Sequence, residues 1–243
     1  GLACQNLKPV VAIYSTFLQR AYDQLIHDIA IQNLNVTFAL DRSGLVGEDG
    51  PTHSGNYDIA YLRCIPNMIV TTPSNEVETR LLLTSAFNFD GPATVRYPRG
   101  SGPNKTFEES LNEIPIGKAN LIREGDKKSI ILNFGALLHE AEKVAESLNL
   151  TLIDMRFVKP LDEDILKNHL KHADLVVTLE DGCIAGGAGS AVQEFCSKQS
   201  FNPRFLILGI PDSFIEHASR DEMLEECGLT ASKIENKVLK MME

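Results

Sequence analysis

Short apolar runs alternate with longer amphipathic stretches through the first hundred residues of the chain. The runs at residues 9–14, 36–40, 68–72 and 93–97 have the length and the β-branched content of buried strands. Between them, apolar side chains recur at roughly helical spacing, which predicts helices over residues 17–34, 57–65 and 73–86. Strands and helices that alternate in this way are typical of a parallel sheet covered by helices.

A second alternating unit begins at residue 117. Its predicted strands cover residues 129–134, 151–155, 175–179 and 205–210, and its predicted helices cover residues 137–148, 162–172, 186–196 and 221–242. The intervening residues are rich in glycine, proline, asparagine and acidic side chains, as linkers often are. We therefore predict an α/β fold of two successive three-layer domains, each a mainly parallel sheet flanked by helices, over residues 1–100 and 117–243, with a linker at 101–116.

Composition and charge disfavour several classes of protein. The 243 residues are 43% apolar, which is ample for a buried core, and no run of about 18 apolar residues predicts a membrane span. The net charge of −10 disfavours a nucleic-acid surface. The chain opens without Met and without a signal-peptide pattern, so we expect Gly1 to lie inside a longer natural chain. A cytoplasmic protein, or one of the plastid stroma in a plastid-bearing organism, is the expected setting.

The cysteines disfavour both a disulfide framework and a zinc site. Their number is odd, their spacing is wide, and neither a CxxC motif nor a cysteine–histidine pair is present. We expect buried, reduced thiols in a cytosol-like compartment, and no metal ligands in this chain. The five residues are Cys4, Cys64, Cys183, Cys196 and Cys227.

The segment from Asp41 to Gly55, with the sequence DRSGLVGEDGPTHSG, follows the predicted strand at residues 36–40. Its four glycines allow the backbone to approach a ligand, and a loop at the carboxyl end of a strand is where an α/β sheet binds ligands. Asp49 and His53 are four residues apart, and a carboxylate with an imidazole suits proton transfer or the holding of a polar substrate. A polar turn that caps the strand explains the glycines equally well.

Aromatic and cationic side chains gather where predicted strands end. Tyr14, Phe17 and Arg20 follow the first strand at intervals of three. Arg20, Arg42 and Arg99 each lie at or just beyond a strand end, and such ends share one edge of a parallel sheet. Three guanidinium groups at that edge could hold a phosphate, and Phe17 could stack on a flat heterocycle. The alternatives are three unrelated surface arginines and a phenylalanine of the core.

Several other polar features carry weaker signals. Arg96 lies within a predicted strand, where a structural ion pair is expected. The GGAGS at residues 186–190 could bind phosphate at a helix start, but the dinucleotide fingerprint is incomplete, which favours a tight turn. Glu180 and Asp181 end a strand, where they could contact a partner domain. His217 is a lone loop histidine that could line a subunit contact, although a solvated or locally satisfied side chain is favoured.

Five segments together resemble the transketolase-like thiamine diphosphate enzymes, and the resemblance runs over essentially the whole chain. GEDGPTH is shared among transketolases, whereas YSTFLQRAYDQ and RCIPNM are similar to the branch that condenses pyruvate with D-glyceraldehyde 3-phosphate and releases CO₂. The product of that branch is a precursor of isoprenoids, thiamine and pyridoxal. The segments are YSTFLQRAYDQLIHD (14–28), DRSGLVGEDGPTH (41–53), YLRCIPNM (61–68), RYPRG (96–100) and DMRFVKPLD (154–162).

The resemblance implies a homodimeric transferase of three α/β domains that uses thiamine diphosphate and Mg²⁺. This chain would supply most of the pyrimidine-binding domain and the whole C-terminal domain. The N-terminal domain, which would bind the diphosphate and Mg²⁺, is not in the sequence. The essential glutamate of the family is expected shortly upstream of Gly1, so we expect the chain to be inactive without the missing half.

The resemblance also implies roles for individual side chains. Phe17 would stack on the aminopyrimidine of the cofactor. His53 would hydrogen-bond the pyruvate-derived unit and assist proton movement, and Asp49 would bind the hydroxyl or aldehyde of the acceptor. The acceptor phosphate would be held by Tyr14, Arg42 and Arg99, with Arg20 lining the same pocket.

Two other interpretations remain open. The chain could come from another thiamine enzyme, such as a transketolase or the β-subunit of a 2-oxo-acid dehydrogenase. It could also be a non-catalytic dimerisation or regulatory module.

Overall fold

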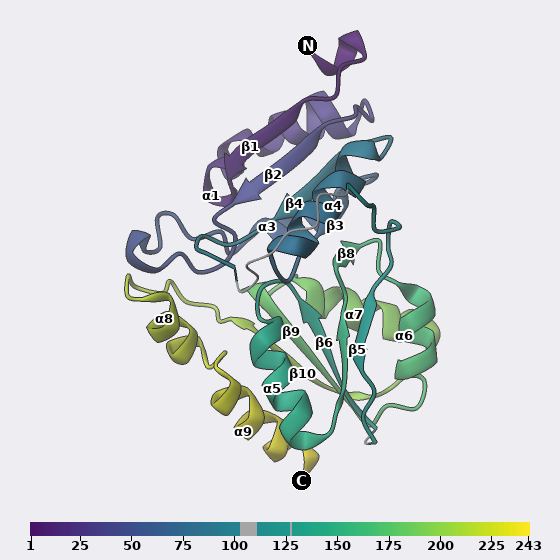
Figure 1. Ribbon diagram of the computed structural model, residues 1–243, viewed down its shortest axis with the longest axis vertical. Helices are drawn as coiled ribbons and strands as arrows, with labels where there is room; N and C mark the ends of the chain where they lie inside the picture. Colours follow the sequence, from purple (N-terminus) through teal and green to yellow (C-terminus); the bar gives the residue numbers. More distant parts are fainter. Residues whose placement is uncertain (103–110, 127) are drawn as a thin grey trace.

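The computed structural model describes residues 1–102, 111–126 and 128–243 (Figure 1). Within these residues the chain forms two five-stranded, mostly parallel sheets, each flanked by helices, which confirms the predicted fold class. In Figure 1 the first sheet lies above the second, and the helices near the C-terminus run along the outer side of the second. The predicted linker at 101–116 falls partly on residues 103–110, which lie outside the described residues.

The first sheet has the strand order β1-β2-β4-β3-β8. Four of its strands are parallel, and β8 pairs with β3 in the antiparallel direction. Because β8 comes from the second half of the chain, it joins the two halves within one sheet. The sequence did not indicate this strand, which has only three residues. The strands are β1 (Val10–Tyr14), β2 (Thr37–Asp41), β3 (Ile69–Thr71), β4 (Ala93–Arg96) and β8 (Phe157–Lys159).

The predicted continuous helix over residues 17–34 is wrong in one respect, because the segment changes helix type along its length. Leu25 and Ala30 are both buried and lie five residues apart. A π-helical turn, which bonds residues five apart, brings them to one face. The segment comprises α1 (Ser15–Leu18), η2 (Gln19–Ala21), α2 (Tyr22–Gln24) and the π-helix η3 (Leu25–Ala30).

The other helices of the first half follow the predicted pattern closely. The helix α4 begins after Asn75 rather than at Pro73 or Ser74, because the Asn75 side chain accepts the Glu78 N–H and caps the helix. The helix α3 packs on β3 and β8 and also on β9 of the second sheet, so it belongs to the contact between the halves. The remaining elements are η1 (Ala3–Gln5), η4 (Gly47–Asp49), α3 (Asp58–Arg63) and α4 (Glu76–Asn88).

The second sheet has the strand order β10-β9-β6-β7-β5, with β5 antiparallel at one edge. The strand β5 was not predicted from the sequence. The C-terminal helix predicted over residues 221–242 is two helices, because Gly228 takes a left-handed conformation (φ 68°) that ends the first of them. The strands are β5 (Asn120–Arg123), β6 (Ser129–Phe134), β7 (Thr151–Asp154), β9 (Leu175–Cys183) and β10 (Arg204–Ile210). The helices are α5 (Leu138–Leu148), α6 (Glu163–Leu170), α7 (Ala188–Gln199), α8 (Arg220–Cys227) and α9 (Ala231–Met242).

A buried guanidinium group links the two halves of the chain. Arg96, at the end of β4, is only 2% exposed. Its Nε lies 3.1 Å from both carboxylate oxygens of Asp58 on α3, and its Nη1 donates to the Asp181 carboxylate on β9. A buried charge requires such partners, so the predicted structural role of Arg96 is confirmed. A continuous apolar cluster with members from both halves, such as Leu40 and Leu132, surrounds this contact.

The cysteines are all free thiols, but they differ in burial. Cys196 and Cys227 are buried and Cys183 is partly buried. The expectation of burial is wrong for Cys4, which lies in a short turn near the chain start, and for Cys64. The Cys64 thiol lies just after α3 and donates to the Tyr61 carbonyl at 3.2 Å. Within the described ranges, no helix is long and apolar enough to cross a membrane.

The Arg96 link predicts a large loss of stability on substitution. Arg96→Met would leave two carboxylates buried without their cation, and the free energy of unfolding should fall by about 3–5 kcal/mol. Chemical denaturation measures this change. Arg204→Met at an exposed position is the matched control and should change stability by less than about 0.5 kcal/mol. An Arg96→Met protein as stable as the control would contradict the prediction.

Asp154 predicts a specific dependence of stability on pH. Its carboxyl is buried, and burial raises its pKa to about 7. An unfolded aspartate titrates near pH 4, so the folded chain binds this proton more tightly. The resulting stability is complete below about pH 4 and is lost as the pH rises through 7. Between pH 5 and pH 8 the free energy of unfolding should therefore decrease less in Asp154→Asn than in the wild type, by at least about 1 kcal/mol.

Urea titrations at several pH values test this prediction. Asp212→Asn, at an exposed position, is the control and should leave the pH profile of the wild type unchanged. Identical profiles for Asp154→Asn and the wild type would refute the role given to the Asp154 proton.

Candidate functional site

Four side chains from the carboxyl edge of the first sheet form an aromatic cluster, defined here as Tyr14, Phe17, Arg42 and His53. The rings of Tyr14 and Phe17 are stacked, with centroids 5.1 Å apart and planes 13° apart. The His53 ring meets Phe17 edge-on at 5.6 Å. The Arg42 guanidinium carbon lies 3.8 Å above the centre of the Tyr14 ring, a close cation–π contact. These four predicted site residues are therefore brought together.

Local geometry explains how the cluster forms. Tyr14 ends β1 in an extended conformation, and the turn of α1 that follows places Phe17, three residues on, against it. Arg42 directly follows β2 and has a left-handed backbone (φ 60°), which is uncommon for a residue with a side chain. The Asp41 carboxylate accepts from both the Arg42 backbone N–H (2.7 Å) and its Nη1 (2.5 Å), which fixes this turn.

The cluster has groups that remain available to a ligand. Phe17 is 42% exposed, which excludes the alternative that it belongs to the core. The Nε of Arg42 is buried and has no hydrogen-bond acceptor within the described part of the chain. An exposed aromatic ring next to a guanidinium with an open donor suits a flat, partly anionic ligand.

Asp58 holds the two segments that carry the cluster. Its Oδ2 accepts from the Ser15 hydroxyl at 2.9 Å and from the Ser43 hydroxyl at 3.0 Å. Ser15 follows Tyr14 and Ser43 follows Arg42, so one carboxylate fixes both strand ends. Sequence reasoning missed Asp58. The available signal was an acidic residue at the start of YDIAYL, where the neighbouring apolar side chains indicate a buried helix face.

In the loop after β2, the side chains of Asp49 and His53 have different partners. Asp49 Oδ2 lies 3.4 Å from the Arg99 guanidinium, which also donates to the Val46 carbonyl at 3.2 Å. His53 Nδ1 lies 2.9 Å from the Thr52 hydroxyl. The Asp49 side chain therefore pairs with Arg99, and the His53 ring belongs to the aromatic cluster. The Thr52 hydroxyl lies between them, because it also donates to the Asp49 carbonyl at 3.4 Å.

Arg20 lies outside the contacts that join the other predicted site residues. It lies on η2, is exposed, and makes no ion pair or hydrogen bond with the residues that the structure describes. Its place in the same pocket as Arg42 and Arg99 remains a prediction.

The GGAGS segment does not offer a free phosphate site. It forms the turn between β9 and α7, and the Glu180 carboxylate already accepts the first N–H groups of the helix, from Ala188 at 2.8 Å and Gly189 at 2.9 Å. A side chain at Gly187 would collide with Glu180, which explains the glycine. The segment is thus the tight turn that the incomplete fingerprint favoured. Burial raises the pKa of Glu180 to about 7.

The structure also shows the contacts of Glu180, its neighbour Asp181 and His217. Glu180 contacts the start of α7, whereas its neighbour Asp181 makes the contact with the other half of the chain through Arg96. His217 is exposed and packs against Gly50 of the loop that carries Asp49. Among the described residues, no group of three or more His, Cys, Asp or Glu side chains is arranged to hold a metal ion.

Comparisons with known proteins identify the family. Residues 1–105 match the pyrimidine-binding domain of transketolase, and residues 117–234 match the transketolase C-terminal domain. Proteins named 1-deoxy-D-xylulose-5-phosphate synthase are 56% identical in Pseudomonas aeruginosa and 57% identical in Stutzerimonas stutzeri. The whole chain is covered in both comparisons, but it spans only 39% and 38% of those relatives.

Solved structures agree with this assignment. A chain described as a split-gene transketolase, in an inactive β4 tetramer, has a TM-score of 0.86 and 29% identity, over 99% of this chain and 77% of that one. The transketolase of Campylobacter jejuni has a TM-score of 0.75 at 20% identity, over 96% of this chain and 36% of that one, which shows a shared fold. The chain therefore belongs to the transketolase family of enzymes, of which it contains the pyrimidine-binding and C-terminal domains.

Proposed function

We propose that this chain is the acceptor side of a 1-deoxy-D-xylulose-5-phosphate synthase, which condenses pyruvate with D-glyceraldehyde 3-phosphate and releases CO₂. The relatives that carry this name are 56–57% identical over the chain. The observation that carries the proposal is the aromatic cluster, with an exposed Phe17 between Tyr14 and His53 and with Arg42 over Tyr14. It combines a stacking surface, a proton-transfer group and a cation in one place.

Phe17 fits the pyrimidine ring of thiamine diphosphate. Its ring is partly exposed and is backed on one side by Tyr14, so a flat heterocycle can cover it without displacing core side chains. When bound, the cofactor supplies the nucleophilic carbon that transfers the pyruvate-derived unit to the aldehyde. We place the ligands of its diphosphate and of Mg²⁺ in an N-terminal domain outside this sequence.

Arg42, Arg99 and Tyr14 would hold the phosphate of the acceptor. The open Nε of Arg42 can donate a charge-assisted hydrogen bond. Arg99 is 3.4 Å from Asp49 at a partly exposed position, a weak pair that a dianion can replace. Release of Asp49 would leave its carboxylate to accept a hydrogen bond from the acceptor hydroxyl. Fixing the phosphate in this way holds the aldehyde in an attack geometry.

His53 would provide the proton. Its Nδ1 is paired with the Thr52 hydroxyl, which orients the ring, while Nε2 has no protein partner among the described residues. The Thr52 hydroxyl donates to the Asp49 carbonyl at 3.4 Å, so the N–H of the neutral ring lies on Nδ1 and points to Thr52. In its protonated form the ring can also donate from Nε2 to the oxygen that becomes a hydroxyl when the new carbon–carbon bond forms.

Several properties follow for the complete enzyme. Because the chain spans about two fifths of its synthase relatives, we expect it to act with a diphosphate-binding N-terminal segment, in a cytoplasmic homodimer. The inactive β4 assembly of the split-gene transketolase supports the expectation that this part alone is inactive. The similarity to that transketolase also keeps ketose-donor chemistry as the second candidate. Activity with ketose donors but not with pyruvate would favour it.

Substitution of the two phosphate-binding arginines tests the acceptor assignment. In a protein reconstituted with the N-terminal segment, Arg42→Ala or Arg99→Ala should raise the KM for D-glyceraldehyde 3-phosphate about tenfold or more, since each removes a charged hydrogen bond. The KM for pyruvate should change much less. Steady-state CO₂ release measures both constants, and Arg204→Ala is the control. A fall in kcat with both KM values unchanged would argue against the phosphate role and would favour a structural one.

The stacking role of Phe17 has a matched control in Phe87. Phe87 is 41% exposed, as Phe17 is 42% exposed, but it lies on α4 against Lys8 and away from the cluster. Phe17→Ala should weaken thiamine diphosphate binding to the reconstituted protein about tenfold, because the stacking surface is lost. Phe87→Ala should leave it unchanged. Titration of the cofactor by isothermal calorimetry decides between these outcomes, and equal affinities for both variants would exclude the stacking role.

A further inference from the structure

Thr16 joins two segments of the candidate site. It lies on α1 between Ser15 and Phe17, and its hydroxyl donates to the main-chain carbonyl of Thr52 at 3.2 Å. Thr52 directly precedes His53 in the loop after β2. This hydrogen bond therefore connects the turn that carries the exposed ring of Phe17 with the loop that carries the imidazole.

The partner of the Thr16 hydroxyl lies in a different segment, whereas threonine hydroxyls in helices commonly bond a carbonyl one turn earlier. The hydroxyls of Thr79 and Thr84 on α4 do so, at 2.8 and 3.0 Å. Because α1 begins only at Ser15, the residue four positions before Thr16 belongs to β1 rather than to a helical turn. The Thr16 hydroxyl is therefore used between segments and not within its own helix.

Thr52 extends this connection to the imidazole. Its hydroxyl donates to the Asp49 carbonyl at 3.4 Å, and the same oxygen lies 2.9 Å from His53 Nδ1. Since a hydroxyl has a single proton, the oxygen accepts from Nδ1. The position of Thr52 thus determines both the place of the ring and the nitrogen that bears its proton.

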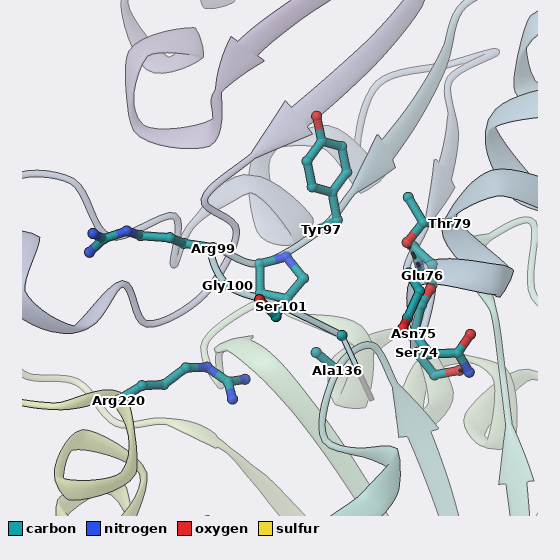
Figure 2. Close-up of a pocket in the computed structure, with 13 residues that line it drawn as sticks. Ser74, Asn75, Glu76, Thr79, Tyr97, Arg99, Gly100, Ser101, Ala136 and Arg220 are labelled. Atoms are coloured by element: carbon teal, nitrogen blue, oxygen red, sulfur yellow. Dashed lines mark hydrogen bonds between the residues drawn. The ribbon is translucent and has the colours of Figure 1, made fainter. Parts of the chain in front are cut away.

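The loop has a second anchor, at Asp49. The Arg99 guanidinium lies 3.4 Å from Asp49 Oδ2. Figure 2 shows the Arg99 side chain pointing away from Ser74 and Asn75, on the far wall of the cavity of about 260 Å³ that it borders. In the proposed function the acceptor phosphate takes Arg99 from Asp49, so this anchor is given up when the acceptor binds. The bond of Thr16 is to an uncharged carbonyl, and it remains in place.

We propose that Thr16 is a positioning residue for His53. Through the carbonyl and the hydroxyl of Thr52 it holds the imidazole edge-on to Phe17, at 5.6 Å, with the proton of the neutral ring on Nδ1. This arrangement belongs to the chain itself. Its use to move a proton while the acceptor is bound rests on the proposed function.

Nuclear magnetic resonance of the ring nitrogens tests the arrangement in the chain alone. At a pH where the imidazole is neutral, long-range ¹H–¹⁵N spectra distinguish a proton on Nδ1 from one on Nε2, and a His53→Gln sample identifies the His53 signals. The wild type should have the proton on Nδ1 and cross-peaks between the ring protons of His53 and Phe17. Thr52→Val should shift the proton towards Nε2, because the acceptor for Nδ1 is lost. Thr16→Val should shift it in the same direction and weaken the cross-peaks to Phe17, because the Thr52 carbonyl is no longer held.

Two control variants accompany these spectra. Thr16→Ser keeps the hydroxyl and should give the wild-type spectrum. Thr84→Val removes a half-buried threonine hydroxyl from α4 and should leave the His53 signals unchanged. Thermal unfolding shows whether each variant is folded, and Thr16→Ala takes the place of Thr16→Val if that variant is not. A wild-type proton on Nε2, or His53 signals that are the same with and without the Thr16 hydroxyl, overturns the proposal.

Kinetics of the reconstituted enzyme test the catalytic consequence. Thr16→Val should lower kcat about tenfold or more, because a displaced proton-transfer group loses much of its effect, while the KM for D-glyceraldehyde 3-phosphate changes little. Thr16→Ser should restore the rate. An active enzyme in which Thr16→Val leaves kcat unchanged overturns the positioning role. A wild-type enzyme that releases no CO₂ from pyruvate contradicts the proposed function instead, and the spectra of the chain alone then decide whether Thr16 positions His53.

Discussion

The buried contact of Arg96 with Asp58 and Asp181 is the constraint on which the rest of this structure depends. A charge inside a protein is tolerated only when its partners are fixed in good geometry, because its hydration has been lost. Here the three charged groups come from β4, α3 and β9, so the contact forms only when both sheets are in place. The apolar cluster with members from both halves adjoins this contact, so the two sheets must also pack together for the charged groups to be buried.

This constraint also determines where the candidate site lies. Asp58 is fixed by Arg96, and its Oδ2 also accepts hydrogen bonds from the hydroxyls of Ser15 and Ser43. Those serines adjoin Tyr14 and Arg42, so the aromatic cluster is positioned by the same carboxylate that links the domains. Phe17 can remain exposed because the turn that carries it is held from behind.

The features that could be predicted from the sequence are those that depend on residues close together in the chain. Apolar runs predicted the longer strands, and the position of Arg42 and Arg99 just beyond strand ends predicted that both would lie at one edge of the sheet. The features that were missed depend on distant segments. The strand β8 is too short to have a pattern of its own and exists because β3 offers an edge to it. The π-helical turn at Leu25 arises from packing, since helical spacing alone cannot show which residues are buried.

The same distinction applies to the polar residues of the site. Stacking of Phe17 on Tyr14 follows from a spacing of three, and sequence reasoning could place them together. The pairing of Asp49 with Arg99 joins residues fifty positions apart, and the loop conformation that allows it depends on turns at Gly47 and Gly50. The spacing of Asp49 and His53 suggested one shared function, but their side chains have different partners, Arg99 for Asp49 and the Thr52 hydroxyl for His53. The two residues are linked only through Thr52, whose hydroxyl also donates to the Asp49 carbonyl, among the contacts that the structure describes.

The arginines of this region form a series in which the extent of pairing indicates the role. Arg96 has every strong contact filled by carboxylates and is buried, which leaves no capacity for a ligand. Arg42 is held at Nη1 by Asp41 but keeps an open Nε, and Arg99 has one weak ion pair. Since a guanidinium gains most from an anion when its own protein contacts are fewest, ligand affinity should increase along this series while structural importance decreases. The position of each arginine in the fold agrees with that order, because Arg96 lies between the sheets, whereas Arg42 and Arg99 lie just beyond the carboxyl ends of β2 and β4.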